Sequence, residues 1–171
     1  MYLFDLSART AGDIRLELFG PPLASMATYL SAIEAPVPGW FNRLEALVGD
    51  ADRLHLSFDL GGDGTVGERI GVEASYALLP QSDPRWSALF KRLETAGLCA
   101  EDVAEGIEAW VGQEDRSEMP ESWPAHPALS QGRIVRLLSH VKLVGRADGE
   151  PVAKIYLLFR FIDWRTARRR R

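Results

Sequence analysis

The chain has 171 residues, of which 46% are hydrophobic and 26% charged, and its formal net charge is −4. These values are typical of one soluble globular domain, and no apolar run approaches the roughly 18 residues that a membrane-spanning helix needs. The N-terminal MYLFDLSART has no basic region and no apolar run of signal-peptide length, and Cys99 is the single cysteine. We therefore expect a cytoplasmic protein without an internal disulfide and without a membrane partner.

Positive charge is concentrated at the C-terminus, where Arg165 and Arg168 to Arg171 supply five cations in the last seven residues. The remainder of the chain then holds 15 basic against 24 acidic residues. Because an acidic body repels a polyanion, we expect no nucleic-acid partner. The sequence predicts a single domain over residues 1–164, followed by a disordered basic tail over 165–171.

The N-terminal third predicts a hairpin followed by two helices. In Leu3–Phe19 two apolar alternating stretches flank a turn at Ala11-Gly12-Asp13, which is typical of a hairpin. Leu23–Ala35 has a helical composition and ends at the proline-rich Pro36-Val37-Pro38-Gly39. Apolar residues recur at helical spacing over Trp40–Val48, which predicts a second helix.

The run Arg53–Tyr76 predicts a central hairpin around the turn GGDGTVG. On its first strand the side chains of His55, Ser57 and Asp59 alternate with leucines and a phenylalanine. On its second strand Arg69 and Glu73 alternate with apolar residues. Because side chains of a strand alternate between two faces, one side of this hairpin is apolar and the other is polar.

Two more helices, a loop and a third hairpin are expected in the second half of the chain. Pro84 opens a helix that ends near Gly97, and Ala100–Val111 predicts another helix. Gln113–Gly132 is acidic and contains prolines, which predicts a long surface loop in which Trp123 is a candidate contact residue. The last hairpin is expected to pair residues 136–144 with residues 152–162. The order ββ-αα-ββ-αα-loop-ββ predicts an α+β fold, with an antiparallel sheet of about six strands and helices on one face.

The third hairpin has a polar face of its own, formed by His140 and Lys142 on one strand and by Lys154, Tyr156 and Arg160 on the other. If the second and third hairpins are neighbours in one sheet, their polar faces converge. The predicted binding residues are Arg69, Glu73, His140, Lys142, Lys154, Tyr156 and Arg160, together with Trp123. The alternative is a solvated sheet face that is stabilised by cross-strand charge pairs such as Arg69 with Asp59.

No pattern in the sequence indicates catalytic chemistry, a cofactor or a metal. The glycine-rich turn at 61–67 lacks the lysine-serine pair of a phosphate-binding loop and precedes no helix. The three histidines, His55, His126 and His140, are not at the spacing of zinc ligands, and Cys99 is isolated. We therefore predict no catalytic residue, no metal ligand and no cofactor.

Three segments of the chain together resemble a family of uncharacterised bacterial proteins. They are LHLSFDLGGDGTVGERIGVEASY, PRWSALFKRLETAGLCAEDVAEGIEAWVG and LSHVKLVGRADGEPVAKIYLLF, within about residues 40–160. Members of that family are encoded near enzymes that tailor ribosomally made peptides. The resemblance implies a role in natural-product biosynthesis. The small size, the absence of a catalytic motif, the long acidic loop and sheet edges open to strand addition then favour a non-catalytic subunit, which binds a tailoring enzyme and its precursor peptide in a protein complex.

The alternation of helix pairs with hairpins, and the Lys154-x-Tyr156 strand, are also similar to the αββα repeat of aromatic prenyltransferases. Those enzymes close about five repeats into a ten-stranded barrel whose interior cations hold a diphosphate. That resemblance implies an alternative function, an enzyme that acts on an allylic diphosphate through Arg69, Lys142, Lys154 and Arg160. Glu73 is then the residue available to activate the acceptor. A sheet that closes favours the enzyme, and a sheet that stays open favours the binding subunit.

Overall fold

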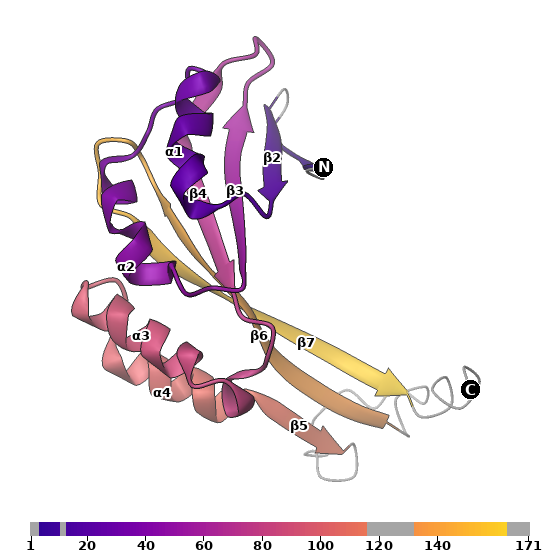
Figure 1. The fold of residues 1–171 in the computed structure, drawn as a ribbon. Coiled ribbons are helices and arrows are strands. Elements are labelled where there is room, and N and C mark those ends of the chain that lie inside the picture. The colour runs from indigo at the N-terminus through magenta and orange to yellow at the C-terminus, as the bar shows by residue number, and fades with distance from the viewer. Residues whose placement is uncertain (1–3, 11–12, 116–131, 164–171) are drawn as a thin grey trace.

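A computed structural model describes residues 4–10, 13–115 and 132–163. These residues form one antiparallel sheet and a layer of helices (Figure 1). The strands are β1 (Phe4–Thr10), β2 (Asp13–Phe19), β3 (Arg53–Leu60), β4 (Val66–Ser75), β5 (Gly112–Asp115), β6 (Gly132–Gly145) and β7 (Val152–Asp163). The helices are α1 (Leu23–Ala32), α2 (Leu44–Val48), α3 (Arg85–Thr95) and α4 (Glu101–Trp110), and a 3₁₀ turn at Gly39–Arg43 leads into α2.

The strands follow the order β1-β2-β3-β4-β6, and β6 is the strand that joins the two halves of the sheet. Residues 141–145 of β6 pair with β4, and residues 133–136 pair with β5 on the same edge. β7 runs along the opposite edge of β6 over almost its whole length. Within the described ranges the sheet therefore ends at β1, at β5 and at β7 and does not close into a barrel.

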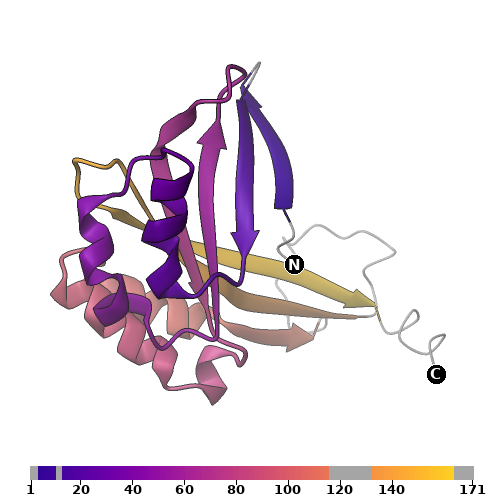
Figure 2. The ribbon, with the colours of Figure 1, turned by 45° about the horizontal axis from the view of Figure 1, so that its top comes forward.

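The expected α+β class is confirmed, and the three predicted hairpins correspond to β1–β2, β3–β4 and β6–β7. All four α-helices lie on one face of the sheet, as the order of elements predicted (Figure 2). The β6–β7 ribbon, with β5 beside it, extends past the helices (Figures 1 and 2).

β5 is the element that the sequence analysis missed, since residues from Gln113 onward were predicted to be loop. Its sequence has no apolar alternation, and charge pairs with β6 hold the strand in place instead. The Arg136 guanidinium lies 2.6 Å from a carboxylate oxygen of Glu114, and Arg133 donates a hydrogen bond to Asp115 at 3.0 Å. Trp123, most of the predicted loop and the arginine tail lie outside the described residues.

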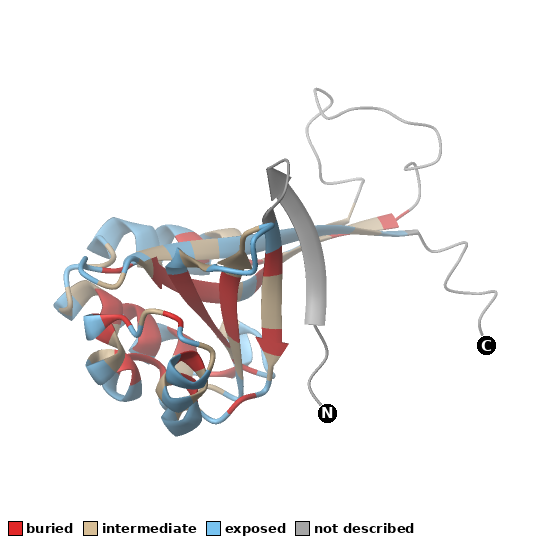
Figure 3. Ribbon diagram, turned by 90° about the horizontal axis from the view of Figure 1, so that it is seen from above, coloured by how far each residue is buried: buried red, intermediate tan, exposed pale blue. Residues whose placement is uncertain are grey.

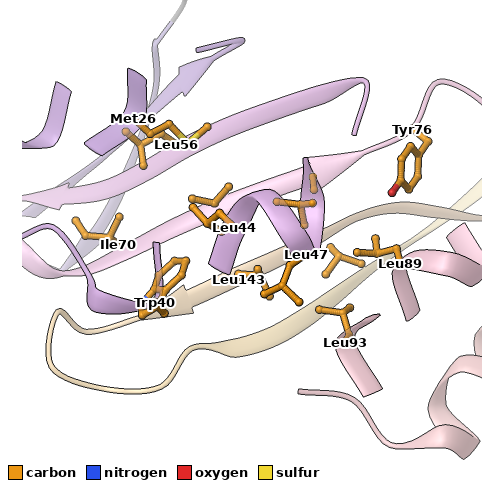
Figure 4. Close-up of a cluster of buried hydrophobic side chains, with 14 of the residues drawn as sticks. Met26, Trp40, Leu44, Leu47, Leu56, Ile70, Tyr76, Leu89, Leu93 and Leu143 are labelled. Atoms are coloured by element: carbon orange, nitrogen blue, oxygen red, sulfur yellow. The ribbon is translucent and has the colours of Figure 1, made fainter. Parts of the chain in front are cut away.

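The core lies between the helices and the inward face of the sheet (Figure 4). Leu56, Ile70, Val72 and Leu143 of the strands pack there against Met26, Trp40, Leu44, Trp86 and Leu89 of the helical layer. Side chains alternate between the two faces along each strand, so the polar residues of β3, β4 and β6 face away from the helices. At the centre of the sheet both faces are buried, since Ser57, Glu73 and Lys142 are as inaccessible as their apolar neighbours (Figure 3). The helical spacing of Val103 and Ile107 predicts that both face inward, but Val103 is exposed on α4.

Among the described residues no helix has the length and apolar character needed to cross a membrane.

Candidate functional site

The sheet face that the helices leave uncovered carries one polar row across four neighbouring strands. In the strand register His55 of β3 lies opposite Glu73 of β4, and Glu73 lies opposite Lys142 of β6. Lys142 in turn lies opposite Lys154 of β7. The polar faces of the second and third hairpins therefore lie on one sheet, as their alternation predicted.

Glu73 is the centre of a polar cluster formed by His55, Glu73, His140 and Lys142. One carboxylate oxygen accepts a hydrogen bond from Lys142 Nζ at 2.7 Å. The other oxygen lies 3.5 Å from His140 Nε2 and 3.7 Å from His55 Nδ1. The side chains of Glu73 and Lys142 are only 11% and 4% exposed, so this ion pair is largely removed from water.

The electrostatics of the cluster keep Glu73 ionised. Burial alone raises the pKa of the Glu73 carboxyl, but its interactions with His55 and Lys142 and the neighbouring charges outweigh burial and lower that pKa to about 2. The pKa of His140 is lowered mainly by burial, with Lys142 and His55 acting in the same direction against Glu73. At neutral pH Glu73 is therefore a carboxylate, and burial favours the neutral form of His140.

A glycine makes room for the buried lysine. Lys142 crosses above Gly71 of β4, where an added Cβ would lie 2.6 Å from Lys142 Cε and 2.7 Å from Ser57 Oγ. Its ammonium also lies 4.0 Å from a carboxylate oxygen of Glu17 on β2. The lysine thus reaches across the sheet only because position 71 has no side chain.

Aromatic rings flank the polar cluster on both sides. The rings of Phe19 and His55 meet edge to face at 4.4 Å, and those of His140 and Tyr156 stack at 4.3 Å. A cavity of about 360 Å³ opens between the histidines and is lined by Phe19, Arg53, His55, Glu73, Ser75, Ser139 and His140. The stack of Tyr156 on His140 connects this cavity to the edge strand β7.

The structure brings together only some of the predicted binding residues. Glu73, His140, Lys142 and Tyr156 are in contact through the cluster and the ring stack. Arg69 is on the same face four residues further along β4, about 13 Å away at the usual strand rise, in a second cavity with Val144 and Val152. Arg160 is likewise four residues from Tyr156 along β7, where it lies opposite Val135 on the β6–β7 ribbon. Trp123 lies outside the described residues.

The suggested charge pair between Arg69 and Asp59 is not the one that forms. Asp59 accepts two hydrogen bonds from the Arg15 guanidinium at 2.7 Å, across β2 and β3. The ladder of β3 and β4 is irregular between Phe58 and Leu60, which shifts Asp59 away from its expected partner. The first hairpin therefore supplies the cation that the sequence analysis assigned to the second.

β7 combines an open edge with exposed apolar side chains. Among the described strands it pairs with β6 alone. Ala153 and Ile155 pack against the core, whereas Leu157 and Leu158, on opposite faces, are each 47% exposed. In Figure 3 much of this ribbon is pale blue where it passes beyond the helices. A strand of 12 residues with apolar groups on both faces is a ready partner for another strand.

Glu73 and Cys99 are poorly suited to general-base and nucleophilic chemistry. A carboxylate whose pKa is lowered to about 2 is a weak base, and the charge of Lys142 is balanced by its ion pair with that carboxylate. In the part of the chain that the structure describes, no group of three His, Cys, Asp or Glu residues is arranged to hold a metal ion. The pKa of the Cys99 thiol is raised by burial and by nearby carboxylates, which disfavours a thiolate nucleophile.

Sequence reasoning missed the contribution of the first hairpin to this face. Phe19 and Glu17 have the alternation of the polar side of β2, and the register of β2 with β3 sets them opposite His55 and Ser57. The alternation along β2 indicates that Glu17 and Phe19 share a face, but that face can be assigned to the polar cluster only once the first and second hairpins are known to be neighbours. His55 belonged to the predicted polar row and proves to be part of the cluster.

Comparison of the chain with protein-family models, with curated proteins and with solved structures finds no match.

Proposed function

We propose that this chain is a non-catalytic partner subunit that binds a peptide or an enzyme during the maturation of ribosomally made peptides. The observation that carries the proposal is the open edge of β7, with its exposed apolar side chains. The resemblance of three segments to proteins encoded near tailoring enzymes supports the biological setting. Tyr156 of β7, which stacks on His140, joins this edge to the polar cluster.

Strand addition is the binding mode that this geometry favours. An extended peptide that pairs with β7 obtains main-chain hydrogen bonds from the edge and contacts from side chains on both faces. Leu157 then contacts it on the helix-side face, and Tyr156 and Leu158 contact it on the polar face. The stack of Tyr156 on His140 makes β7 continuous with the polar cluster.

Replacing Leu158 with lysine is expected to weaken binding of the partner about tenfold, while the fold stays intact. The leucine is exposed, so the substitution removes apolar contact with the partner and costs the free protein little. The measurement is titration of the purified protein with the precursor peptides and enzymes encoded beside it. Leu78→Lys is the matched control, because Leu78 is equally apolar and exposed but lies between β4 and α3. Equal loss in both variants contradicts a site on β7.

Backbone methylation of the bound peptide tests the binding mode directly. Only every second residue of an added strand directs its N–H toward β7. N-methylation of that alternate set should abolish binding, whereas methylation of the other set should leave it within a few-fold. If both sets behave alike, the peptide does not add as a strand.

Incubation of the protein with dimethylallyl diphosphate and peptides containing tryptophan or tyrosine should leave the peptide masses unchanged. The described sheet is open, and Lys142, a cation that the prenyltransferase alternative needs, is bound to Glu73. Mass spectrometry of the peptides is the measurement. A gain of one isoprenyl unit that disappears in Lys154→Ala would promote the enzyme over the binding subunit.

A further inference from the structure

We infer that the edge of β7 selects an extended segment that has two acidic side chains six residues apart and apolar side chains between them. This inference rests on the proposed function and names the class of peptide that the same edge takes. It is carried by the order of charges and apolar groups along β7, not by the polar cluster.

Two exposed cations mark the ends of the selective part of β7. Lys154 and Arg160 are on the same face of the strand as Tyr156 and Leu158, because they are an even number of residues apart. At about 3.3 Å per residue the two cations are separated by roughly 20 Å. An added strand has the same rise, so side chains that face both cations are also six residues apart, and opposite charges are the favourable cross-strand pair.

Between the two cations the edge is apolar on both faces. Tyr156 and Leu158 are exposed on the polar face, and Leu157 is exposed on the other face. Residues of an added strand that lie directly opposite these three share their faces and come within side-chain contact. A segment with apolar residues at these positions removes the exposed surface from water on both sides of the sheet.

Charge also argues against a second copy of this chain as the occupant. Two β7 strands that pair antiparallel and symmetrically about Leu157 set Lys154 of each copy opposite Arg160 of the other. Like charges directly opposite each other destabilise a ladder. The edge therefore fits an acidic partner segment better than it fits itself.

The test uses two synthetic peptides of eleven residues that differ only in charge. One has glutamate at its third and ninth positions, with valine, leucine and tyrosine between them, and the other has lysine at both positions. Titrated by fluorescence anisotropy at low salt, the glutamate peptide should bind about tenfold more tightly, since two cross-strand pairs change from attraction to repulsion. Lys154→Glu/Arg160→Glu should invert this preference. The matched control, Lys91→Glu/Arg43→Glu, changes the net charge equally on the helical side and should preserve it.

Each outcome separates this inference from the proposed function. Equal affinity for the two peptides, or inversion of the preference by the control variant, overturns the charge pattern while leaving strand addition intact. Failure of both peptides to bind overturns the inference and the β7 site together. A dimer in sedimentation that Leu158→Lys dissociates shows that the edge takes a second copy and overturns the acidic partner.

Discussion

Replacing Lys142 with alanine is expected to lower the free energy of unfolding by about 3–5 kcal/mol, because it leaves the Glu73 carboxylate buried without its cation. The side chains of Lys142 and Glu73 are 4% and 11% exposed, and Lys142 Nζ lies 2.7 Å from a carboxylate oxygen of Glu73, so the substitution removes the nearest cation from a largely buried carboxylate. Urea denaturation of the two proteins is the measurement. Lys154→Ala is the control, since Lys154 lies directly opposite on the same face but is exposed, and it should change stability by less than about 0.5 kcal/mol.

The double variant Glu73→Leu/Lys142→Met tests why Lys142→Ala is unstable: because the Glu73 carboxylate is left buried and unpaired, or because the ion pair itself stabilises the fold. Replacing both charges with apolar groups of similar volume removes the buried carboxylate along with the lysine. The double variant should therefore recover most of the stability that Lys142→Ala loses. If it is as unstable as the single variant, the cluster stabilises the sheet through more than its charge balance.

The same pair contributes to the stability of the protein in acid. The pKa of Glu73 is about 2 in the folded protein against 4.5 ordinarily, so its stabilising contribution is complete above pH 4.5 and is lost as the pH falls toward 2. In Lys142→Met the pKa of Glu73 rises, because burial still acts on it and the lysine does not. The decrease in urea midpoint between pH 4.5 and 2 should then be smaller than in the parent protein.

Substitution of Gly71 by alanine is expected to destabilise the protein by up to about 3 kcal/mol, since it overpacks the site that Lys142 crosses. The new Cβ lies 2.6 Å from Lys142 Cε and 2.7 Å from Ser57 Oγ, and both of those residues are buried. The measurement is again the free energy of unfolding. In the background of Lys142→Ala the cost of Gly71→Ala should fall, because one of the two clashing groups has been removed.

Gly112→Ala is the matched control for this substitution. Gly112 is also in a strand, and an added Cβ there has its nearest neighbour at 3.8 Å, which is an ordinary contact. It should cost little. An equal loss of stability at both glycines means that the general effect of alanine in a strand, not the path of Lys142, explains the result at Gly71.

The sequence predicted which side chains share a face better than it predicted which side chains touch. The period of two assigned Glu73, His140, Lys142 and Tyr156 to the polar face without any knowledge of register. Their contacts depend on β4 pairing with β6, and no local pattern encodes a pairing between strands that are so far apart in the chain. Arg69 and Arg160 have the right alternation but lie too far along their strands to join the cluster.

β5 and α4 show two other limits of local patterns. β5 has no apolar period because ion pairs with β6 hold it, and such pairs are visible only after the strands are aligned. On α4 the spacing placed Val103 inward, yet only Ile107 of that helix is buried. α4 packs against α3, so a narrower apolar stripe than the helical period suggests is enough to attach it.

The contact between Glu73 and Lys142 joins residues 69 positions apart, and this separation has a consequence for the order of folding. Closing so long a segment costs more chain entropy than forming either neighbouring hairpin. We therefore expect the hairpins β1–β2 and β3–β4 to form early, and β6 to add only after α3 and α4 have folded between them. Until that last step the ammonium of Lys142 and the carboxylate of Glu73 both remain hydrated, so the free-energy cost of removing them from water arises late in folding. Substitutions in the pair should then change mainly the rate of unfolding and leave the rate of early folding unchanged.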